Sequence, residues 1–191
     1  MKKDINNECN SLVVKNSLSN KQSLILYFYI YSFLGWAIET IYAFCLLGGF
    51  SKRGFLFGPL CPIYGFGAII MLLFISQYKD NSIKNFFASA IVFSIFEYLA
   101  GFALEAILKI RLWDYTNDFF NINGRISLLY TLFWGIAGVI FINNIHPFMK
   151  KITEKLLNKI NSIMQVNIIT ILVIIFLSDV VLSCIKYIKL F

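Results

Sequence analysis

Five long apolar runs limit what this chain can fold into more than any other feature. They lie at about residues 24–47, 59–77, 86–108, 126–143 and 166–187. About 20 apolar residues are enough for a helix to cross the hydrocarbon of a bilayer. Within hydrocarbon the chain must satisfy every backbone N–H and C=O itself, and a helix does so. The sequence therefore predicts an all-α fold, a polytopic integral membrane bundle of about five transmembrane helices.

The composition favours the bilayer over water. Hydrophobic residues make up 59% of the 191 residues and charged residues 14%, whereas a soluble domain averages about 45–50% and about 25%. The net charge of +7 would suggest a nucleic-acid partner in a soluble protein. Here an excess of lysine in cytoplasmic loops explains the charge. We therefore expect the lipid bilayer, and no nucleic acid, as the main partner of the surface.

An odd number of spans puts the termini on opposite sides, and the basic residues decide which side is cytoplasmic. Ten Lys and Arg residues fall on the N-terminal side and seven on the other. This predicts a multi-pass protein of the cell membrane with a cytoplasmic N-terminus. All three arginines, Arg53, Arg111 and Arg125, fall on the exterior side. Because arginine suits fixed bidentate pairing, they are candidates for site residues.

Composition divides the chain into four regions. Residues 145–164 place Phe148, Ile152 and Leu156 on one helical face with lysines opposite, which is typical of an amphipathic interfacial helix. The regions are a polar, basic N-terminal tail (1–22), a four-helix membrane core (23–143), an amphipathic cytoplasmic-face helix (144–165), and a fifth transmembrane helix with the C-terminus (166–191).

The core contains a candidate tandem repeat of a two-helix unit, with both units running in the same membrane direction. Each unit reads as glycine and glutamate, then an exterior loop with an arginine, then an aromatic–glycine pair. The members are Gly35, Glu39, Arg53, Tyr64 and Gly65 in the first unit, and Gly101, Glu105, Arg125, Trp134 and Gly135 in the second. Small residues also recur on one face of the second helix of each unit, which favours close helix packing.

Four acidic residues fall within the predicted spans: Glu39, Glu97, Glu105 and Asp179. A carboxylate facing lipid costs roughly 2.5–3.5 kcal/mol, so each should face the bundle interior with a partner. With the N-terminus inside, Glu97 lies near mid-membrane and the other three lie in the outer half.

These carboxylates converge with the exterior arginines on a candidate outward-facing polar site. Helix N-termini, which attract anions, point at the same place. The site suits a small anionic or zwitterionic ligand such as a carboxylate, phosphate or lipid headgroup. The alternative is that Glu39–Arg53 and Glu105–Arg125 are ion pairs that fix helix register. The candidate ligand-binding residues are Glu39, Arg53, Glu97, Glu105, Asp114 and Arg125.

The sequence offers little for catalysis. We find no nucleophile–base pair, no metal-ligand cluster and no G-x-x-x-x-G-K-[ST] phosphate loop. The four cysteines have no CxxC spacing and read as buried thiols. We expect no cofactor, no metal and no catalytic residue, and we leave open whether the chain is an enzyme.

Five segments carry a resemblance to a known family: SFLGWAIET (32–40), RGFLFGPLCPIYGFG (53–67), EYLAGFALE (97–105), WDY (113–115) and FNINGRI (120–126). In these segments the chain resembles the ABC-transporter type IV family of small bacterial permease-like membrane proteins. The resemblance implies transport and, without a phosphate loop in this chain, a partner ATPase subunit. Five spans are few for a complete transporter, so we expect either a homo-oligomer or a partner subunit.

Three hypotheses for function follow. The first is a membrane transport component, ABC permease-like, with the outward-facing Glu/Arg site. The second is a membrane-embedded enzyme acting on a lipid headgroup at the outer leaflet. The third is a structural or regulatory membrane subunit whose charges only hold the bundle together.

Overall fold

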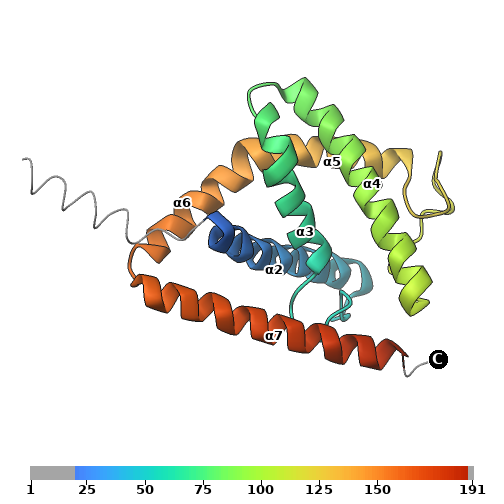
Figure 1. Ribbon diagram of the computed structural model, residues 1–191. Coiled ribbons are helices and arrows are strands. Elements are labelled where there is room, and N and C mark those ends of the chain that lie inside the picture. Colours follow the sequence, from blue (N-terminus) through green and yellow to red (C-terminus); the bar gives the residue numbers. More distant parts are fainter. Residues whose placement is uncertain (1–19, 189–191) are drawn as a thin grey trace, which may run out of the picture.

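The computed structural model describes residues 20–188, and within that range the regular structure is helical (Figure 1). The only strand-like pairing in this part of the chain is one isolated bridge, between Ile122 and Ile126. The prediction of an all-α fold is confirmed. The helices are α2 (Asn20–Leu47), α3 (Pro62–Ile70), α4 (Ser82–Leu108), α5 (Leu128–Ile140), α6 (His146–Leu157) and α7 (Ser162–Ile188).

Four helical stretches are long and apolar enough to cross a membrane: Lys21–Leu47, Ser82–Leu108, Leu128–Leu157 and Ser162–Ile188. The fifth apolar helix, Pro62–Tyr78, is shorter. The prediction of a multi-pass membrane bundle is confirmed by these five helices. The predicted N-terminal tail lies mostly outside the described residues.

Each of α3 and α5 ends in a widened π turn, Met71–Ile75 after α3 and Phe141–Ile145 after α5. The second π turn leads directly into α6, so the backbone makes no turn at the predicted boundary between residues 143 and 144. Pro147 in the first turn of α6 explains this arrangement. A proline inside a helix clashes with the carbonyl four residues earlier, and a wider turn before it relieves the clash.

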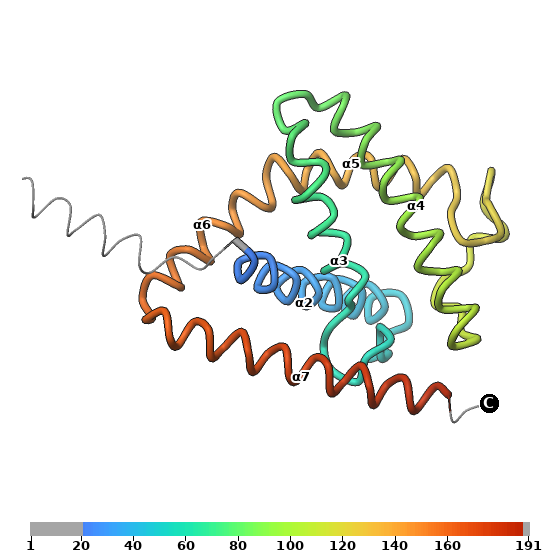
Figure 2. The backbone as a smooth tube through the Cα atoms, in the orientation of Figure 1, coloured from blue at the N-terminus to red at the C-terminus, as the bar shows by residue number. Residues whose placement is uncertain are grey.

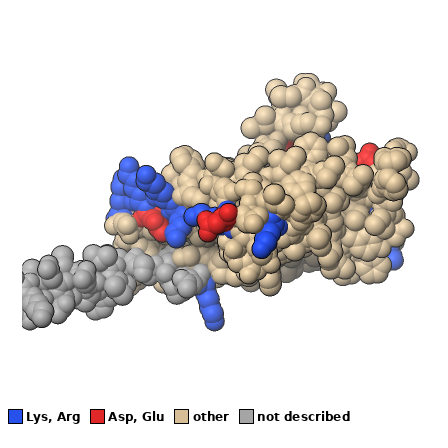
Figure 3. Space-filling view, turned by 90° about the horizontal axis from the view of Figure 1, so that it is seen from above, with Lys and Arg blue, Asp and Glu red and all other residues tan. Residues whose placement is uncertain are grey.

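The helices pair into two hairpins, with α2 packed along α3 and α4 packed along α5. The last helix, α7, runs past α2 and the loop that joins α2 to α3 (Figure 2). A small buried cluster of Met71, Ile75, Phe93 and Ile142 lies where the two hairpins meet. Most large apolar side chains point outward, as lipid contact requires. Figure 3 shows a broad uncharged surface with Lys and Arg side chains gathered toward one side.

Glycines set the distance between the helices of each hairpin. A Cβ at Gly65 would lie 2.2 Å from the Ser32 hydroxyl oxygen and 2.7 Å from the Phe28 backbone oxygen. A Cβ at Gly135 would lie 2.5 Å from the Phe86 ring. Since association in lipid relies on close packing rather than on the hydrophobic effect, these contacts hold the hairpins together.

We expect Gly65→Ala to destabilise the protein, because the new methyl meets backbone that cannot move aside. Overpacking of this kind costs about 1–3 kcal/mol. The measurement is the thermal unfolding midpoint of the purified chain in detergent. Gly49→Ala is the control, since no atom lies within 4 Å of a Cβ at Gly49. Equal midpoints for the two variants would contradict the packing described above.

Candidate functional site

The C-terminal end of α4 and the loop that follows it carry a network of charges. The Arg111 Nε donates to Glu105 Oε1 at 2.6 Å, and the Arg125 Nη2 donates to Glu105 Oε2. Arg111 Nη1 also lies 3.0 Å from Asp114 Oδ2. Two arginines therefore neutralise two carboxylates, and the predicted pair of Glu105 with Arg125 is present.

The loop between α4 and α5, residues 109–127, folds around this network. The Trp113 indole N–H donates to the Arg125 carbonyl at 3.0 Å, and the Tyr115 N–H donates to the Gly124 carbonyl at 2.8 Å. The Thr116 hydroxyl and N–H, and then the Arg111 guanidinium, hold the pKa of the Asp114 carboxyl below its ordinary value. Glu105 and Asp114 thus have partners that account for their charges without a ligand, whereas Arg125 bonds Glu105 but keeps a buried Nε without a partner among the described residues.

Glu97 is different, because every partner it has is neutral. Its side chain is 5% exposed, and it accepts hydrogen bonds from the Tyr115 hydroxyl at 2.9 Å and the Trp134 indole N–H at 2.7 Å. None of the ion pairs among residues 20–188 includes it. A buried carboxylate without a cation is the costly arrangement that marks functional positions in membranes.

Glu39, which is half-buried, also has only neutral partners in the first hairpin. The Tyr64 hydroxyl donates to Glu39 Oε1 at 2.8 Å, and the Cys61 thiol lies 3.9 Å from Oε2. The predicted Glu39–Arg53 ion pair is absent from residues 20–188, because Tyr64 on the adjacent helix holds the carboxylate instead. The Arg53 Nε is buried and has no hydrogen-bond partner in this part of the chain.

The two hairpins correspond at the predicted aromatic–glycine pairs, but with a different glutamate in the second hairpin. Tyr64–Gly65 and Trp134–Gly135 occupy equivalent places, since each aromatic residue donates to a glutamate on the preceding helix. Each π turn begins seven residues after that aromatic residue. The glutamate equivalent to Glu39 is therefore Glu97 and not Glu105.

Further contacts support this register. Phe28 packs against Gly65 and Phe86 packs against Gly135. Glu39 and Glu97 each follow their phenylalanine by eleven residues. This eleven-residue spacing is visible in the sequence. Only the contacts of Phe28 and Phe86 show that Glu97 is the residue equivalent to Glu39.

We refer to the two glutamates and their donors, Glu39 with Tyr64 and Glu97 with Tyr115 and Trp134, as the polar centre. Tyr115 comes from the loop and not from a helix, so sequence reasoning did not select it as a partner. The only sequence feature that pointed to Tyr115 as a site residue was its position next to Asp114 in the WDY segment.

Asp179, the remaining acidic residue in a span, has a structural role. It accepts hydrogen bonds from the N–H groups of Phe57 at 2.8 Å and Gly58 at 2.7 Å, and from the Ser183 hydroxyl at 3.1 Å. Through these bonds α7 holds the loop that carries Arg53. A Cβ at Gly58 would lie 2.9 Å from Asp179 Oδ2, so only glycine allows this approach.

Metal chemistry has no obvious location in the described residues. Within residues 20–188, no three His, Cys, Asp or Glu side chains gather in a way that could hold a metal ion.

Membrane-length helices in paired hairpins, with the buried Glu97 bonded to the loop and the adjacent helix, define a polytopic membrane protein. A family model, described as Putative ABC-transporter type IV, matches residues 26–184. The chain belongs to this family, as its motifs predicted, and is thereby a membrane component of transporter type. No curated protein and no solved structure matches the chain.

We expect Asp179→Ala to destabilise the protein by leaving the Phe57 and Gly58 N–H groups without an acceptor. Each unsatisfied donor costs about 1–3 kcal/mol. Thermal unfolding in detergent measures the effect. Ser178→Ala is the matched control, since the Ser178 hydroxyl bonds only to the Ile174 carbonyl of its own helix. If both variants unfold at the same temperature, Asp179 does not hold the loop.

Proposed function

We propose that this protein is a permease-like transport component whose polar centre binds a small zwitterionic ligand. The cationic group of the ligand would lie at Glu97 and Glu39, and its anionic group at Arg53. The observation that carries the proposal is the burial of Glu97 with only neutral donors around it.

The contrast with Glu105 supports this reading. Glu105 is neutralised by two arginines, so it gains nothing from a ligand cation. Glu97 and Glu39 have hydrogen bonds but no opposite charge. Since an uncompensated carboxylate in hydrocarbon costs about 2.5–3.5 kcal/mol, a cation brought by a ligand would be bound favourably there.

Arg53 supplies the complementary charge. It precedes Gly54, and a Cβ at Gly54 would lie 2.7 Å from the thiol of Cys61, which in turn faces Glu39. The α3 helix begins directly after Cys61, so its positive N-terminal end faces the same region. A carboxylate or phosphate of the ligand would contact both Arg53 and the N-terminal end of α3. Two uncompensated glutamates favour a zwitterion over a simple anion.

The energy for transport would come from a partner. The printed sequence contains no phosphate loop, so ATP hydrolysis by the usual route would need a partner ATPase. A second copy of the chain would add helices to complete a pathway. Membership of an ABC-transporter family supports the presence of a partner ATPase but does not identify it.

Glu97→Gln tests the ligand site with little change of shape, because the amide keeps an oxygen for Tyr115 or Trp134. Glycine, phosphocholine and glycerophosphoethanolamine serve as zwitterionic probes, and thermal unfolding of the purified chain is the measurement. A probe at 100 times its Kd stabilises by about 2.7 kcal/mol, which raises the unfolding midpoint by about 5–10 °C. We expect Glu97→Gln to weaken the active probe by about 30-fold or more, as loss of a buried charge partner does.

Glu105→Gln is the control for this experiment. It breaks a charged network of the loop, so we expect a lower unfolding midpoint with the affinity for the probe retained. The proposal is wrong if Glu97→Gln and the wild type respond alike to every probe, or if Glu105→Gln alone removes the response.

A further inference from the structure

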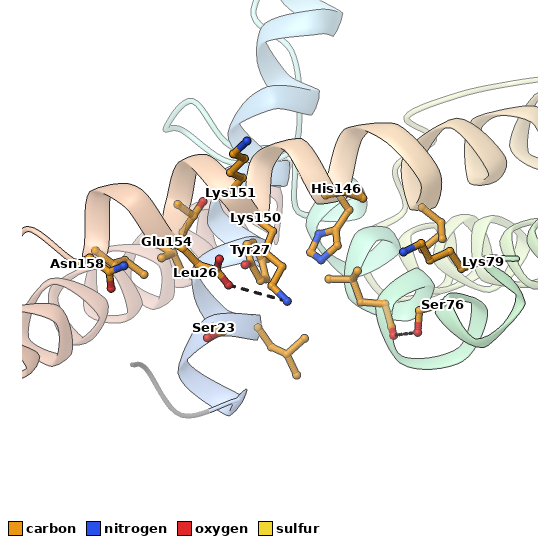
Figure 4. Close-up of a pocket in the computed structure, with 16 residues that line it drawn as sticks. Ser23, Leu26, Tyr27, Ser76, Lys79, His146, Lys150, Lys151, Glu154 and Asn158 are labelled. Carbon is orange, nitrogen blue, oxygen red and sulfur yellow. Dashed lines mark hydrogen bonds and ion pairs between the residues drawn. The ribbon is translucent and has the colours of Figure 1, made fainter. Parts of the chain in front are cut away.

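A groove of about 760 Å³ lies between the start of α2, the end of the Pro62–Tyr78 helix, and α6 (Figure 4). Ser23 and Tyr27 of α2 line it, whereas Glu39 of the polar centre lies on the same helix 16 residues beyond Ser23. At 1.5 Å per residue this separation is about 24 Å. The groove is therefore a second region of the molecule and not an extension of the polar centre.

Two lysines converge on the middle of this groove. Figure 4 shows Lys79 and Lys150 reaching toward the centre from opposite sides, while Lys151 points away. Lys79 forms no ion pair among residues 20–188. Lys150 has one, to Glu154 at 3.9 Å, which is long for an ion pair. Because Glu154 is the only carboxylate in the lining, the groove carries excess positive charge.

In one of its two neutral tautomers His146 offers a hydrogen-bond donor to the groove. The Tyr31 hydroxyl lies 2.9 Å from His146 Nδ1. When that hydroxyl donates, the imidazole proton is on Nε2 and is free to bind an acceptor. Figure 4 shows the ring directed into the groove. Two ammonium groups and a ring N–H around one space form a set of donors that a phosphate group, with its several acceptor oxygens, can satisfy.

Part of the wall is apolar, with Leu24, Leu72 and Ile142 from three helices, and Ser23, Ser76, Thr153 and Asn158 add neutral polar groups. These helices are of the kind that lies in hydrocarbon. An anion that binds here would therefore have a charged head beside the lysines and an apolar part along the wall. Basic pockets between transmembrane helices bind the headgroups of anionic lipids in this way.

We propose that this groove is a binding site for the phosphate of an anionic glycerophospholipid, held between Lys79 and Lys150 with its acyl chains toward the bilayer. The site is independent of the zwitterion site proposed above. It would fix α6 against α2 at the face where lysines predominate.

The test uses the purified full chain in detergent, titrated with dioleoylphosphatidylglycerol or dioleoylphosphatidylcholine and followed by native mass spectrometry. We expect the double variant Lys79→Gln, Lys150→Gln to bind phosphatidylglycerol about 30-fold more weakly than the wild type. Weak binding of phosphatidylcholine should not change. The matched control, Lys84→Gln with Lys155→Gln, removes the same charge from exposed lysines outside the groove and should stay within twofold of the wild type.

A second double variant distinguishes loss of the two charges from loss of the fold. Lys79→Arg with Lys150→Arg keeps both charges, and we expect it to retain selectivity for phosphatidylglycerol. Inorganic phosphate, added as a competitor, distinguishes a lipid phosphate from a free phosphate ion as the ligand of the groove. Displacement of the lipid by phosphate would assign the site to the free anion, and resistance to phosphate would assign it to the lipid. If the groove variant and the control variant bind phosphatidylglycerol equally, the proposal is overturned.

Discussion

A hydrogen bond from an aromatic side chain to a glutamate, across each helical hairpin, is the interaction on which the rest of this structure depends. Tyr64 reaches Glu39 in one hairpin and Trp134 reaches Glu97 in the other. Both bonds require helices that pack closely, and the glycine that follows each aromatic residue allows this. The same pairing that joins the helices thus also holds two carboxylates, neither of which forms an ion pair among the described residues.

The carboxylates of the described chain are stabilised in three different ways, and the differences carry functional meaning. Arginines neutralise Glu105, so that it holds a loop. Backbone N–H groups surround Asp179, so that it joins a helix to another loop. Glu39 and Glu97 accept hydrogen bonds from aromatic side chains of the neighbouring helix or loop, and these are the two carboxylates that we propose meet a ligand. Position within a span alone did not distinguish these roles.

Much of the fold could be predicted from the sequence, since apolar length and small-residue spacing act locally. The Glu105–Arg125 pair could also be predicted, because a long loop returns one residue to the end of the helix that carries the other. The partner of Glu39 could not, because Arg53 and Tyr64 are both near in sequence and only the path of the loop selects between them. Continuity of α5 with α6 was missed because Pro147 usually marks a helix start, and the π turn that accommodates it has no simple sequence signal.

The π turns at equivalent places in both hairpins have a consequence for how the bundle is assembled. A π turn contains one extra residue, and one residue of an α-helix spans about 100° around its axis. The side of the helix that faces a neighbour therefore changes phase at Met71 and at Phe141. From the turn onward Met71, Ile75 and Ile142 pack between the hairpins, in one cluster with Phe93. One added residue per unit lets a single helix serve two interfaces, so that a duplicated pair of helices can become a bundle.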